Sequence, residues 1–171
     1  MIYFIIGGAR SGKSTHAMKM ALERSSHPTY VATARRWDKN FEDRIVRHIA
    51  DRSDQWVTVE VEKEIGKIDL RGKVAVIDCV TLWLTNFFVD SRQHIDDSFS
   101  QAREQFDQLS KQEGVFFVVS NEIGMGVHAP TEDGRKFADL QGRMNQYIAG
   151  KSDTVVLMVA GIAVTVKEHP S

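Results

Sequence analysis

The sequence predicts a three-layer α/β fold in which helices cover both faces of a mostly parallel central sheet. Short and nearly continuous apolar runs alternate along the chain with segments whose apolar residues recur every three or four positions. Runs of the first kind are typical of strands buried on both faces, and the second spacing is typical of helices with one apolar side. A glycine-rich stretch also follows the first apolar run, as it does where a parallel strand leads into a helix.

The order of these segments gives the expected elements. Six apolar runs predict buried strands and a seventh predicts a strand at the edge of the sheet: 1–6, 29–33, 56–61, 74–78, 115–120, 154–160 and 162–166. Apolar stripes predict helices over 95–109 and 137–148, and Gly150 is expected to end the second helix. Each of these helices lies between two predicted strands, which favours parallel neighbours joined by helices.

Length, charge and cysteine content limit the function. A chain of 171 residues with 42% hydrophobic content is expected to form one domain over residues 1–171. The 22 basic and 23 acidic residues give a net charge of −1, which provides no global attraction for nucleic acid or an anionic membrane. Cys79 is the single cysteine, so an internal disulfide and a multi-cysteine zinc site are excluded. Without a signal peptide or a long apolar run, a cytoplasmic protein with a locally bound ligand is expected.

The glycine-rich stretch after the first strand has the pattern of a phosphate-binding loop. Its residues are Gly7, Gly8, Ala9, Arg10, Ser11, Gly12, Lys13 and Ser14. Glycines allow the backbone to approach a polyphosphate, and the helix expected to begin near Lys13 directs its positive dipole end at the anion. Lys13 is predicted to reach the β- and γ-phosphates, and the Ser14 hydroxyl is predicted to bind Mg²⁺. Ala9 stands where a dinucleotide-binding loop has a glycine, so that alternative fails.

A carboxylate ends the apolar run 74–78. Asp78 is expected at the carboxyl edge of the sheet, where open α/β folds bind their ligands. An aspartate at a strand end can also cap a following helix. Because a phosphate-binding loop is present, we favour the metal role and predict that Asp78 is a second Mg²⁺ ligand.

The segment 38–52 has a helical pattern with an apolar stripe formed by Phe41, Ile45 and Ile49. His48 and several arginines flank this stripe. Periodicity alone interprets His48 as a solvated helix residue, because a single histidine is seldom catalytic. The arginines either solvate the helix or bind phosphate oxygens beside a nucleotide.

Several motifs along the chain carry a resemblance to a known family. They lie at 7–14, 30–34, 44–48, 56–60, 78–86, 121–126 and 137–146. Together they are similar to the bifunctional adenosylcobinamide kinase / adenosylcobinamide-phosphate guanylyltransferase family, from the first strand to Lys167. The resemblance implies a P-loop NTPase-like (RecA-like) fold. The chain departs from the family pattern in having one more residue before Pro130, and in having Ala138 where an arginine is usual.

The resemblance implies two successive reactions of cobalamin biosynthesis. ATP or GTP phosphorylates a hydroxyl of adenosylcobinamide, and GTP then transfers GMP to that phosphate with release of pyrophosphate. In the family the second step passes through a covalent GMP–histidine, and the matching position here is His48. A neutral imidazole can attack the α-phosphorus at neutral pH, since its unperturbed pKa is about 6.5. By the same match, residues lining the guanine nucleotide site are Ala32, Thr33, Ala34, Ile49, Ala50, Asp51, Arg52 and Glu60, and Asp78 lies beside the phosphates.

The resemblance also implies a homotrimer. We expect a single domain of this size to leave part of the apolar segment 82–88 uncovered, and we therefore predict a subunit interface there. The other partners are small molecules, namely the corrinoid substrate and the nucleoside triphosphate. Neither nucleic acid nor a membrane is expected.

Other functions share the phosphate-binding loop. A regulatory P-loop NTPase that reads guanine normally has an Asn-Lys-x-Asp element after a strand, whereas the run 115–120 is followed by Asn121 and Glu122. A monofunctional small-molecule kinase needs no nucleophilic histidine, so the role of His48 separates it from the bifunctional enzyme; a monofunctional guanylyltransferase is the converse alternative. An ATPase stimulated by DNA or RNA is disfavoured by the balanced charge.

Overall fold

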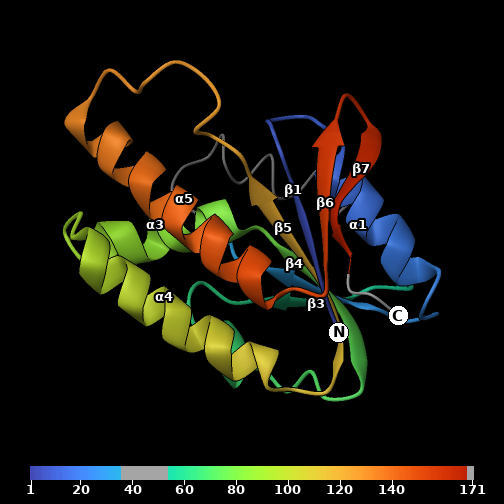
Figure 1. Ribbon diagram of the computed structural model, residues 1–171. Coiled ribbons are helices and arrows are strands. Elements are labelled where there is room, and N and C mark those ends of the chain that lie inside the picture. The colour runs from blue at the N-terminus through green and yellow to red at the C-terminus, as the bar shows by residue number, and fades with distance from the viewer. Residues whose placement is uncertain (36–53, 169–171) are drawn as a thin grey trace.

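A computed structural model describes residues 1–35 and 54–168, and over these residues the chain forms one sheet of seven strands (Figure 1). The strands are β1 (Ile2–Gly7), β2 (Thr29–Ala32), β3 (Val57–Glu60), β4 (Lys73–Asp78), β5 (Gly114–Asn121), β6 (Thr154–Val159) and β7 (Ile162–Glu168). Their order across the sheet is β3-β2-β4-β5-β1-β6-β7. Neighbours from β3 to β6 are parallel, and β7 is antiparallel to β6. The expected mostly parallel sheet is confirmed.

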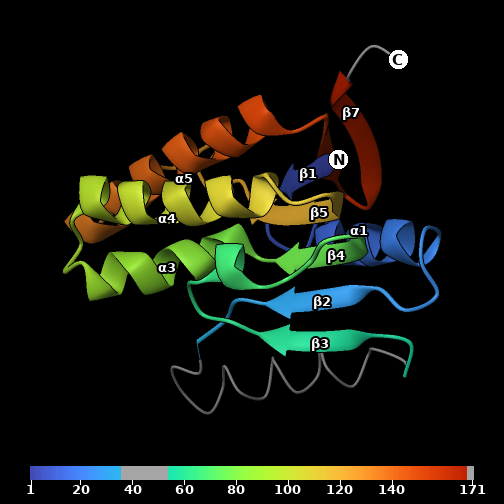
Figure 2. The ribbon, with the colours of Figure 1, turned by 90° about the horizontal axis from the view of Figure 1, so that it is seen from below.

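Helices cover both faces of the sheet (Figure 1, Figure 2). They are α1 (Lys13–Leu22), α3 (Val80–Asp90), α4 (Ile95–Ser110) and α5 (Glu132–Lys151), with a short 3-10 helix, η1 (Ile65–Lys67). Helices α3, α4 and α5 pack on one face, and α1 packs on the other. The described residues therefore have the three-layer architecture expected. None of the helices within these residues is long and apolar enough to cross a bilayer.

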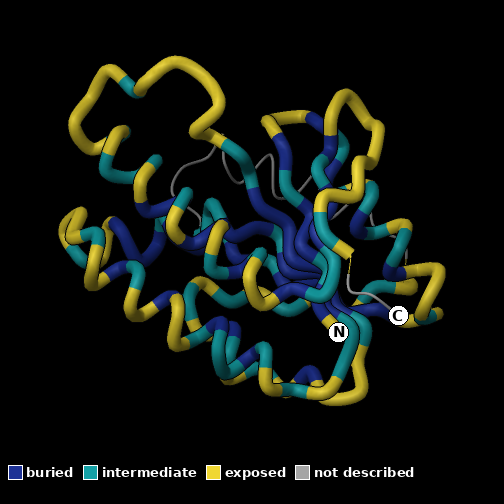
Figure 3. The backbone as a smooth tube through the Cα atoms, viewed as in Figure 1, coloured by how far each residue is buried: buried dark blue, intermediate teal, exposed yellow. Residues whose placement is uncertain are grey.

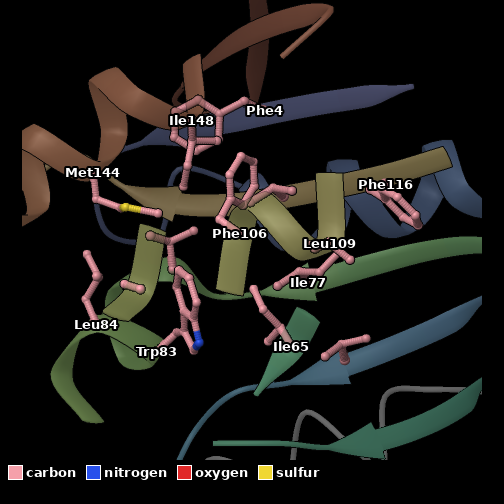
Figure 4. Packing of buried hydrophobic residues seen from close by; sticks show 14 of the residues in the cluster. Phe4, Ile65, Ile77, Trp83, Leu84, Phe106, Leu109, Phe116, Met144 and Ile148 are labelled. Atoms are coloured by element: carbon pink, nitrogen blue, oxygen red, sulfur yellow. The ribbon is translucent and has the colours of Figure 1, made fainter. Parts of the chain in front are cut away.

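Two buried clusters hold the layers together. Figure 3 shows buried residues concentrated along the central strands. The larger cluster joins Phe4 and Ile77 of the sheet to Trp83, Phe106 and Met144 of the three helices on that face (Figure 4). The smaller cluster lies against α1 and contains Ile5, Ala17, Ala21, Tyr30, Val76, Phe117 and Val119, among others. Consecutive residues of β1 face different clusters because strand side chains alternate between the two faces.

Helices α4 and α5 confirm the two predicted apolar stripes. Each begins with acidic residues in its first turn, which complement the helix dipole, and the Thr131 hydroxyl caps α5. The predicted end at Gly150 is wrong, since α5 runs one residue further. The ammonium of Lys167, on β7, donates hydrogen bonds of 2.6 to 3.2 Å to carbonyls at the end of the helix, those of Ala149, Gly150 and Ser152. A neighbouring strand thus satisfies these groups without a glycine cap.

The apolar segment 82–88 forms most of α3, and most of it is buried within the chain. Trp83 and Leu84 have no exposed surface, and Phe87 and Phe88 are 3% and 6% exposed. The prediction that a subunit interface covers this segment is therefore wrong. Helices α4 and α5 and the sheet already cover it. The helix itself was not predicted, because α3 is apolar on more than one side, with Leu82 packed toward the α1 cluster, and so lacks a single stripe.

Exposed apolar side chains lie on the edge strand β7. Ile162, Val164 and Val166 are 68%, 48% and 64% exposed, and Val159 at the end of β6 is 53% exposed. Edge strands with exposed apolar side chains tend to pair with another chain. The predicted helix over 38–52, with His48, lies outside the described residues.

Candidate functional site

The phosphate-binding loop connects β1 to α1 as predicted, and two of its glycines are required by geometry. A Cβ added to Gly7 would lie 2.4 Å from the carbonyl oxygen of Met158, so a side chain at this position would collide with β6. Gly12 adopts a φ of +91° immediately before the helix, and only glycine enters that region without strain. The φ of Arg10 is also positive, at 56°. The backbone is therefore held in the tight turn that an anion-binding loop needs.

Neighbouring segments fasten this loop at both ends. The amide of Glu122 donates to the Gly7 carbonyl at 2.9 Å, and the amide of Gly161 donates to the Ser11 carbonyl at 3.0 Å. Within the loop, the Ser11 amide donates to the Gly8 carbonyl at 3.3 Å. Because strand ends that are remote in sequence hold the loop, its shape is set before any ligand arrives.

Lys13, the first residue of α1, folds back over the loop. Its Nζ donates to the Gly8 carbonyl at 2.6 Å and lies 3.4 Å from the Ser11 hydroxyl. Burial has the largest influence and lowers the pKa of the Lys13 ammonium, while Cys79 and Asp78 nearby act in the opposite direction. A bound polyphosphate would add a stronger favourable interaction with this partly desolvated cation.

Asp78 ends β4 at the carboxyl edge of the sheet, as predicted, and Ser14 is the second residue of α1. The hydroxyl of Tyr30 donates to Oδ2 of Asp78 at 2.5 Å. Tyr30 and Asp78 reach each other because β2 and β4 are parallel neighbours with Tyr30 opposite Val76, two residues before the aspartate. This hydrogen bond orients the carboxylate and leaves its other oxygen for a further partner.

A buried amide on α3 holds two strand ends together. Asn86 has no exposed surface, and its Nδ2 donates to the carbonyls of Thr33 at 2.9 Å and Glu62 at 2.8 Å. The Thr33 hydroxyl in turn donates to the Cys79 carbonyl at 2.9 Å. Thr33 is fully buried, and its hydroxyl is used inside the protein. Its predicted place in the nucleotide site stays a prediction.

One helical turn beyond Asn86, Asp90 forms ion pairs with residues that follow β2 and β3. The guanidinium of Arg35 donates to both oxygens of Asp90, at 2.8 and 3.0 Å, and to Glu62 at 2.6 Å. Lys63 donates to Asp90 at 2.7 Å. These hydrogen bonds, first that of Arg35 and then that of Lys63, hold the pKa of Asp90 well below its usual range. We call this group the α3 clamp; its residues are Arg35, Glu62, Lys63, Asn86 and Asp90.

A cleft of about 330 Å³ opens beside the α3 clamp. It is lined by Ala34, Arg35, Glu60, Val61 and Glu62. Two predicted guanine-site residues, Ala34 and Glu60, therefore lie in one cleft. Ala32 ends β2 and is not among the lining residues, although its carbonyl accepts the Val61 amide at 2.9 Å.

A second cleft, of about 360 Å³, adjoins the phosphate-binding loop on the β6 side. Its walls come from the loop, from the segment after β5 and from the end of β6: Gly8, Ala9, Arg10, Ser11, Glu122, Met125, Leu157, Met158, Val159 and Ala160. Apolar side chains dominate the part away from the loop, and Glu122 is the acidic residue of the lining.

A buried polar network supports the end of β5 between these clefts and α5. The Ser120 hydroxyl donates to Asn145 Oδ1 at 2.7 Å, and Gln141 Nε2 donates to the same two atoms, at 3.0 Å to Ser120 and 2.9 Å to Asn145. Asn145 Nδ2 donates to the Asn121 carbonyl at 3.2 Å. These hydrogen bonds hold the end of β5 against α5.

Five predicted site residues cannot be placed. His48, Ile49, Ala50, Asp51 and Arg52 lie outside the described residues. Within 1–35 and 54–168, no group of three or more histidine, cysteine, aspartate or glutamate side chains is positioned to hold a metal ion.

Several residues at the site were not predicted from sequence. Tyr30 belongs to the predicted strand 29–33 and to the motif 30–34 but was given no role of its own, although a buried tyrosine hydroxyl needs a partner, and that need is a usable signal. Asn86 is a polar residue in an apolar run, which is a comparable signal. Asp90 and Arg35 lie 55 residues apart, and no local pattern connects them.

The fold and the loop define a P-loop nucleotide-binding protein of the α/β class. Nearly the whole chain, residues 3–166, matches the model of the CobU family, described as cobinamide kinase / cobinamide phosphate guanyltransferase. The chain belongs to this family and is a transferase. It is 36% identical over 172 residues to the bifunctional adenosylcobalamin biosynthesis protein CobP of Pseudomonas aeruginosa, with 97% of each chain covered. It is 33% identical over 182 residues to the corresponding CobU protein of Escherichia coli, covering 98% of this chain and 100% of the relative.

Solved structures agree with the fold class. A type III secretion system ATPase superposes with a TM-score of 0.57 at 11% identity, covering 96% of this chain and 56% of the ATPase. A Pyrococcus horikoshii protein, titled as structural study PH0250, superposes with a TM-score of 0.54 at 5% identity, covering 99% of this chain and 87% of that protein. At these identities the likeness concerns the fold alone, and it confirms the expected P-loop NTPase-like architecture.

Proposed function

We propose that this chain catalyses two successive reactions of adenosylcobalamin biosynthesis. It phosphorylates a hydroxyl of adenosylcobinamide with ATP or GTP, and it then transfers GMP from GTP to the resulting phosphate with release of pyrophosphate. The observation that carries the proposal is the preformed loop 7–14 in a chain that matches the kinase and guanyltransferase family over residues 3–166. Both reactions need a triphosphate held by its oxygens.

The loop suits the kinase step. Its backbone amides and the α1 dipole would hold the β- and γ-phosphates, and Lys13 would neutralise charge on the transferred group. Burial disfavours the charged ammonium of Lys13, and a bound phosphate would offset this desolvation cost. A cation held in place in this way contributes more to the transition state than one that must first be ordered.

Ser14 and Asp78 would hold Mg²⁺. The donor set fits this ion, since Mg²⁺ usually keeps several waters and binds through one or two carboxylates plus substrate phosphates. A larger cluster of protein ligands is not required, and the Tyr30 hydrogen bond leaves one Asp78 oxygen for the metal. When bound, the ion neutralises charge on the phosphate oxygens.

We assign the guanylyl step to His48, with GMP carried covalently on its imidazole. The cleft containing Ala34 and Glu60 supports a guanine site at this end of the sheet, because a carboxylate can accept hydrogen bonds from the guanine amino and ring N–H groups. Residues 49–52 complete the proposed site. The protein would act in the cytoplasm as a single domain. It would form a homotrimer through the exposed apolar strand β7 instead of the segment 82–88.

The covalent step is tested with GTP labelled at the α-phosphate. Wild type incubated with GTP and Mg²⁺ should acquire label that is labile to acid and stable to alkali, as a phosphoramidate bond is. His48→Ala should acquire none, while its phosphorylation of adenosylcobinamide stays within about threefold of wild type, since the kinase step needs no nucleophilic histidine. His27→Ala, which changes an exposed histidine before β2, is the matched control.

Absence of label from wild type, or its persistence in His48→Ala, would contradict the covalent mechanism. A wild type that phosphorylates adenosylcobinamide but never transfers GMP would be a monofunctional kinase, and the reverse result would identify a monofunctional guanylyltransferase.

A further inference from the structure

The motif after β5 places a carboxylate beside the phosphate-binding loop. Asn121, the last residue of β5, pairs with Gly7 of β1, and the amide of the next residue, Glu122, donates to the Gly7 carbonyl at 2.9 Å. The side chain of Glu122 lines the second cleft together with Gly8 and the following loop residues. It is therefore fixed at the start of the loop that would hold the transferred phosphate.

Transfer of a phosphoryl group to an alcohol leaves a proton that some base has to accept. Lys13 is a cation that only donates. Asp78 accepts the hydrogen bond of Tyr30 and, in the proposed function, also binds the metal. In the described residues, two carboxylates adjoin the loop, those of Asp78 and Glu122. Glu122 neither accepts a hydrogen bond from a tyrosine nor is proposed to bind the metal.

The orientation of Glu122 is defined by one hydrogen bond. The Gly124 amide donates to its Oε1 at 2.5 Å, while Oε2 has no hydrogen-bond partner among the described residues. One oxygen is thus used to hold the side chain, and the other is free to accept a proton. A fixed base costs less reorganisation at the moment of transfer than a mobile one.

The remaining cleft walls favour an organic acceptor over a second polyphosphate. Met125 is 81% exposed and Val159 is 53% exposed, and both line the cleft beyond Glu122. Apolar surface next to a phosphate loop suits a carbon chain that carries a hydroxyl.

We propose that this cleft receives the hydroxyl-bearing arm of the kinase acceptor and that Glu122 is the catalytic base of the kinase step. The acceptor oxygen forms a bond to the γ-phosphorus, the bond between that phosphorus and the β,γ-bridging oxygen breaks, and the nucleoside diphosphate leaves with the electron pair. The hydroxyl proton passes to Glu122 and then to water. This inference rests on the proposed function, but it concerns the kinase step alone, because the acceptor of the guanylyl step is a phosphate with no hydroxyl proton to remove.

Glu122→Gln provides the test, with each activity assayed separately. The kinase step is followed from adenosylcobinamide, and guanylyl transfer is started from adenosylcobinamide phosphate. We expect the kinase kcat to fall about 100-fold or more, as for loss of a general base. Guanylyl transfer and nucleotide affinity should stay within about threefold of wild type, which shows that the variant is folded. Glu104→Gln, on α4 and outside both clefts, is the matched control.

A kinase kcat within threefold of wild type, or an equal loss of both activities, would overturn the proposal. A second variant makes the test independent of side-chain packing: formate added to Glu122→Ala should raise kinase activity and leave guanylyl transfer unchanged, and equal responses of the two activities would also overturn it. If wild type does not phosphorylate adenosylcobinamide, the proposed function fails. In that case the same variants are compared for phosphoryl transfer to another alcohol, or for hydrolysis of the nucleoside triphosphate, and the comparison still decides whether Glu122 is the base.

Discussion

At the scale of single residues, Gly7 shows how closely the loop is built against its neighbours. The missing side chain allows the backbone to lie against β6, where an added Cβ would stand 2.4 Å from the Met158 carbonyl oxygen and 2.8 Å from the Ser11 hydroxyl. Gly8, the next residue, has no atom within 4 Å of the corresponding position. The two adjacent glycines thus differ: contact with the fold requires a glycine at position 7, whereas the space beside Gly8 is open and, in the proposed function, leaves room for the triphosphate.

Gly7→Ala should destabilise the nucleotide-free protein, and Gly8→Ala should not. Relieving the clash requires backbone movement of a kind that typically costs ~1–3 kcal/mol, which corresponds to a Tm lower by at least about 3 °C in a chain of this length. For Gly8→Ala we expect a change within about 2 °C, as for other uncrowded surface sites. Thermal unfolding followed by circular dichroism measures both, and equal Tm values for the two variants would contradict this account.

At the scale of elements, helix α3 has two roles. Its apolar residues fill the core, and its polar residues Asn86 and Asp90 fasten the ends of β2 and β3. The spacing of four places both polar residues on the same side of the helix. The α3 clamp thereby joins the two segments that line the cleft containing Ala34 and Glu60.

Asp90→Asn should lower the Tm at pH 7 by about 2 to 4 °C. The side chain is 34% exposed, so solvent screening limits its pairs with Arg35 and Lys63 to about 1 kcal/mol in all. Asp96→Asn removes one exposed pair, to Arg143, at 2.8 Å, and one of the two acidic residues in the first turn of α4, so it should lower the Tm by less than about 2 °C. Differential scanning calorimetry of both variants checks this, and a Tm of Asp90→Asn equal to that of Asp96→Asn would count against the clamp.

The stabilising effect of Asp90 should disappear in acid. Hydrogen bonds from Arg35 hold its pKa in the folded protein below the unfolded value of about 4, so the folded state favours the carboxylate. Its contribution is complete above the unfolded pKa and is lost as the pH falls through the lower folded pKa. The Tm difference between wild type and Asp90→Asn should therefore shrink steadily between pH 5 and pH 2, and a constant difference across this range would refute the assignment.

At the scale of the whole molecule, helices cover both faces of the sheet, whereas the edge strand β7 carries exposed apolar side chains in the part of the chain that the structure describes. Apolar side chains of β7 are largely exposed, while most of the apolar residues of α3 are buried. A surface of this kind is one that association with another copy would cover. The proposed trimer should therefore depend on β7 and not on α3.

Light scattering coupled to size-exclusion chromatography tests this assembly. Wild type should elute as a trimer, and the double variant Ile162→Lys, Val164→Lys should elute as a smaller species, since two charges on an edge strand oppose pairing. Both positions are exposed in the single subunit, so its folding should be little affected. Leu22→Lys, at an exposed apolar position on α1, is the control and should remain a trimer. A monomeric wild type would contradict the proposed homotrimer.

Local sequence determined the strands, helices α4 and α5, the start of α1 at Lys13 and the loop with its carboxylate Asp78. These features depend on the spacing of apolar residues and on conformations that few residue types permit, and both can be read over a few neighbouring positions. The family was also predicted from sequence, because its motifs are local.

Only the tertiary structure decided the contacts between remote segments. It placed α3 inside the core, joined Arg35 to Asp90, paired Tyr30 with Asp78, replaced a glycine cap with Lys167, and brought Glu122 to the loop. Each of these depends on which distant elements become neighbours, and the pattern of residues along one element does not specify its partner.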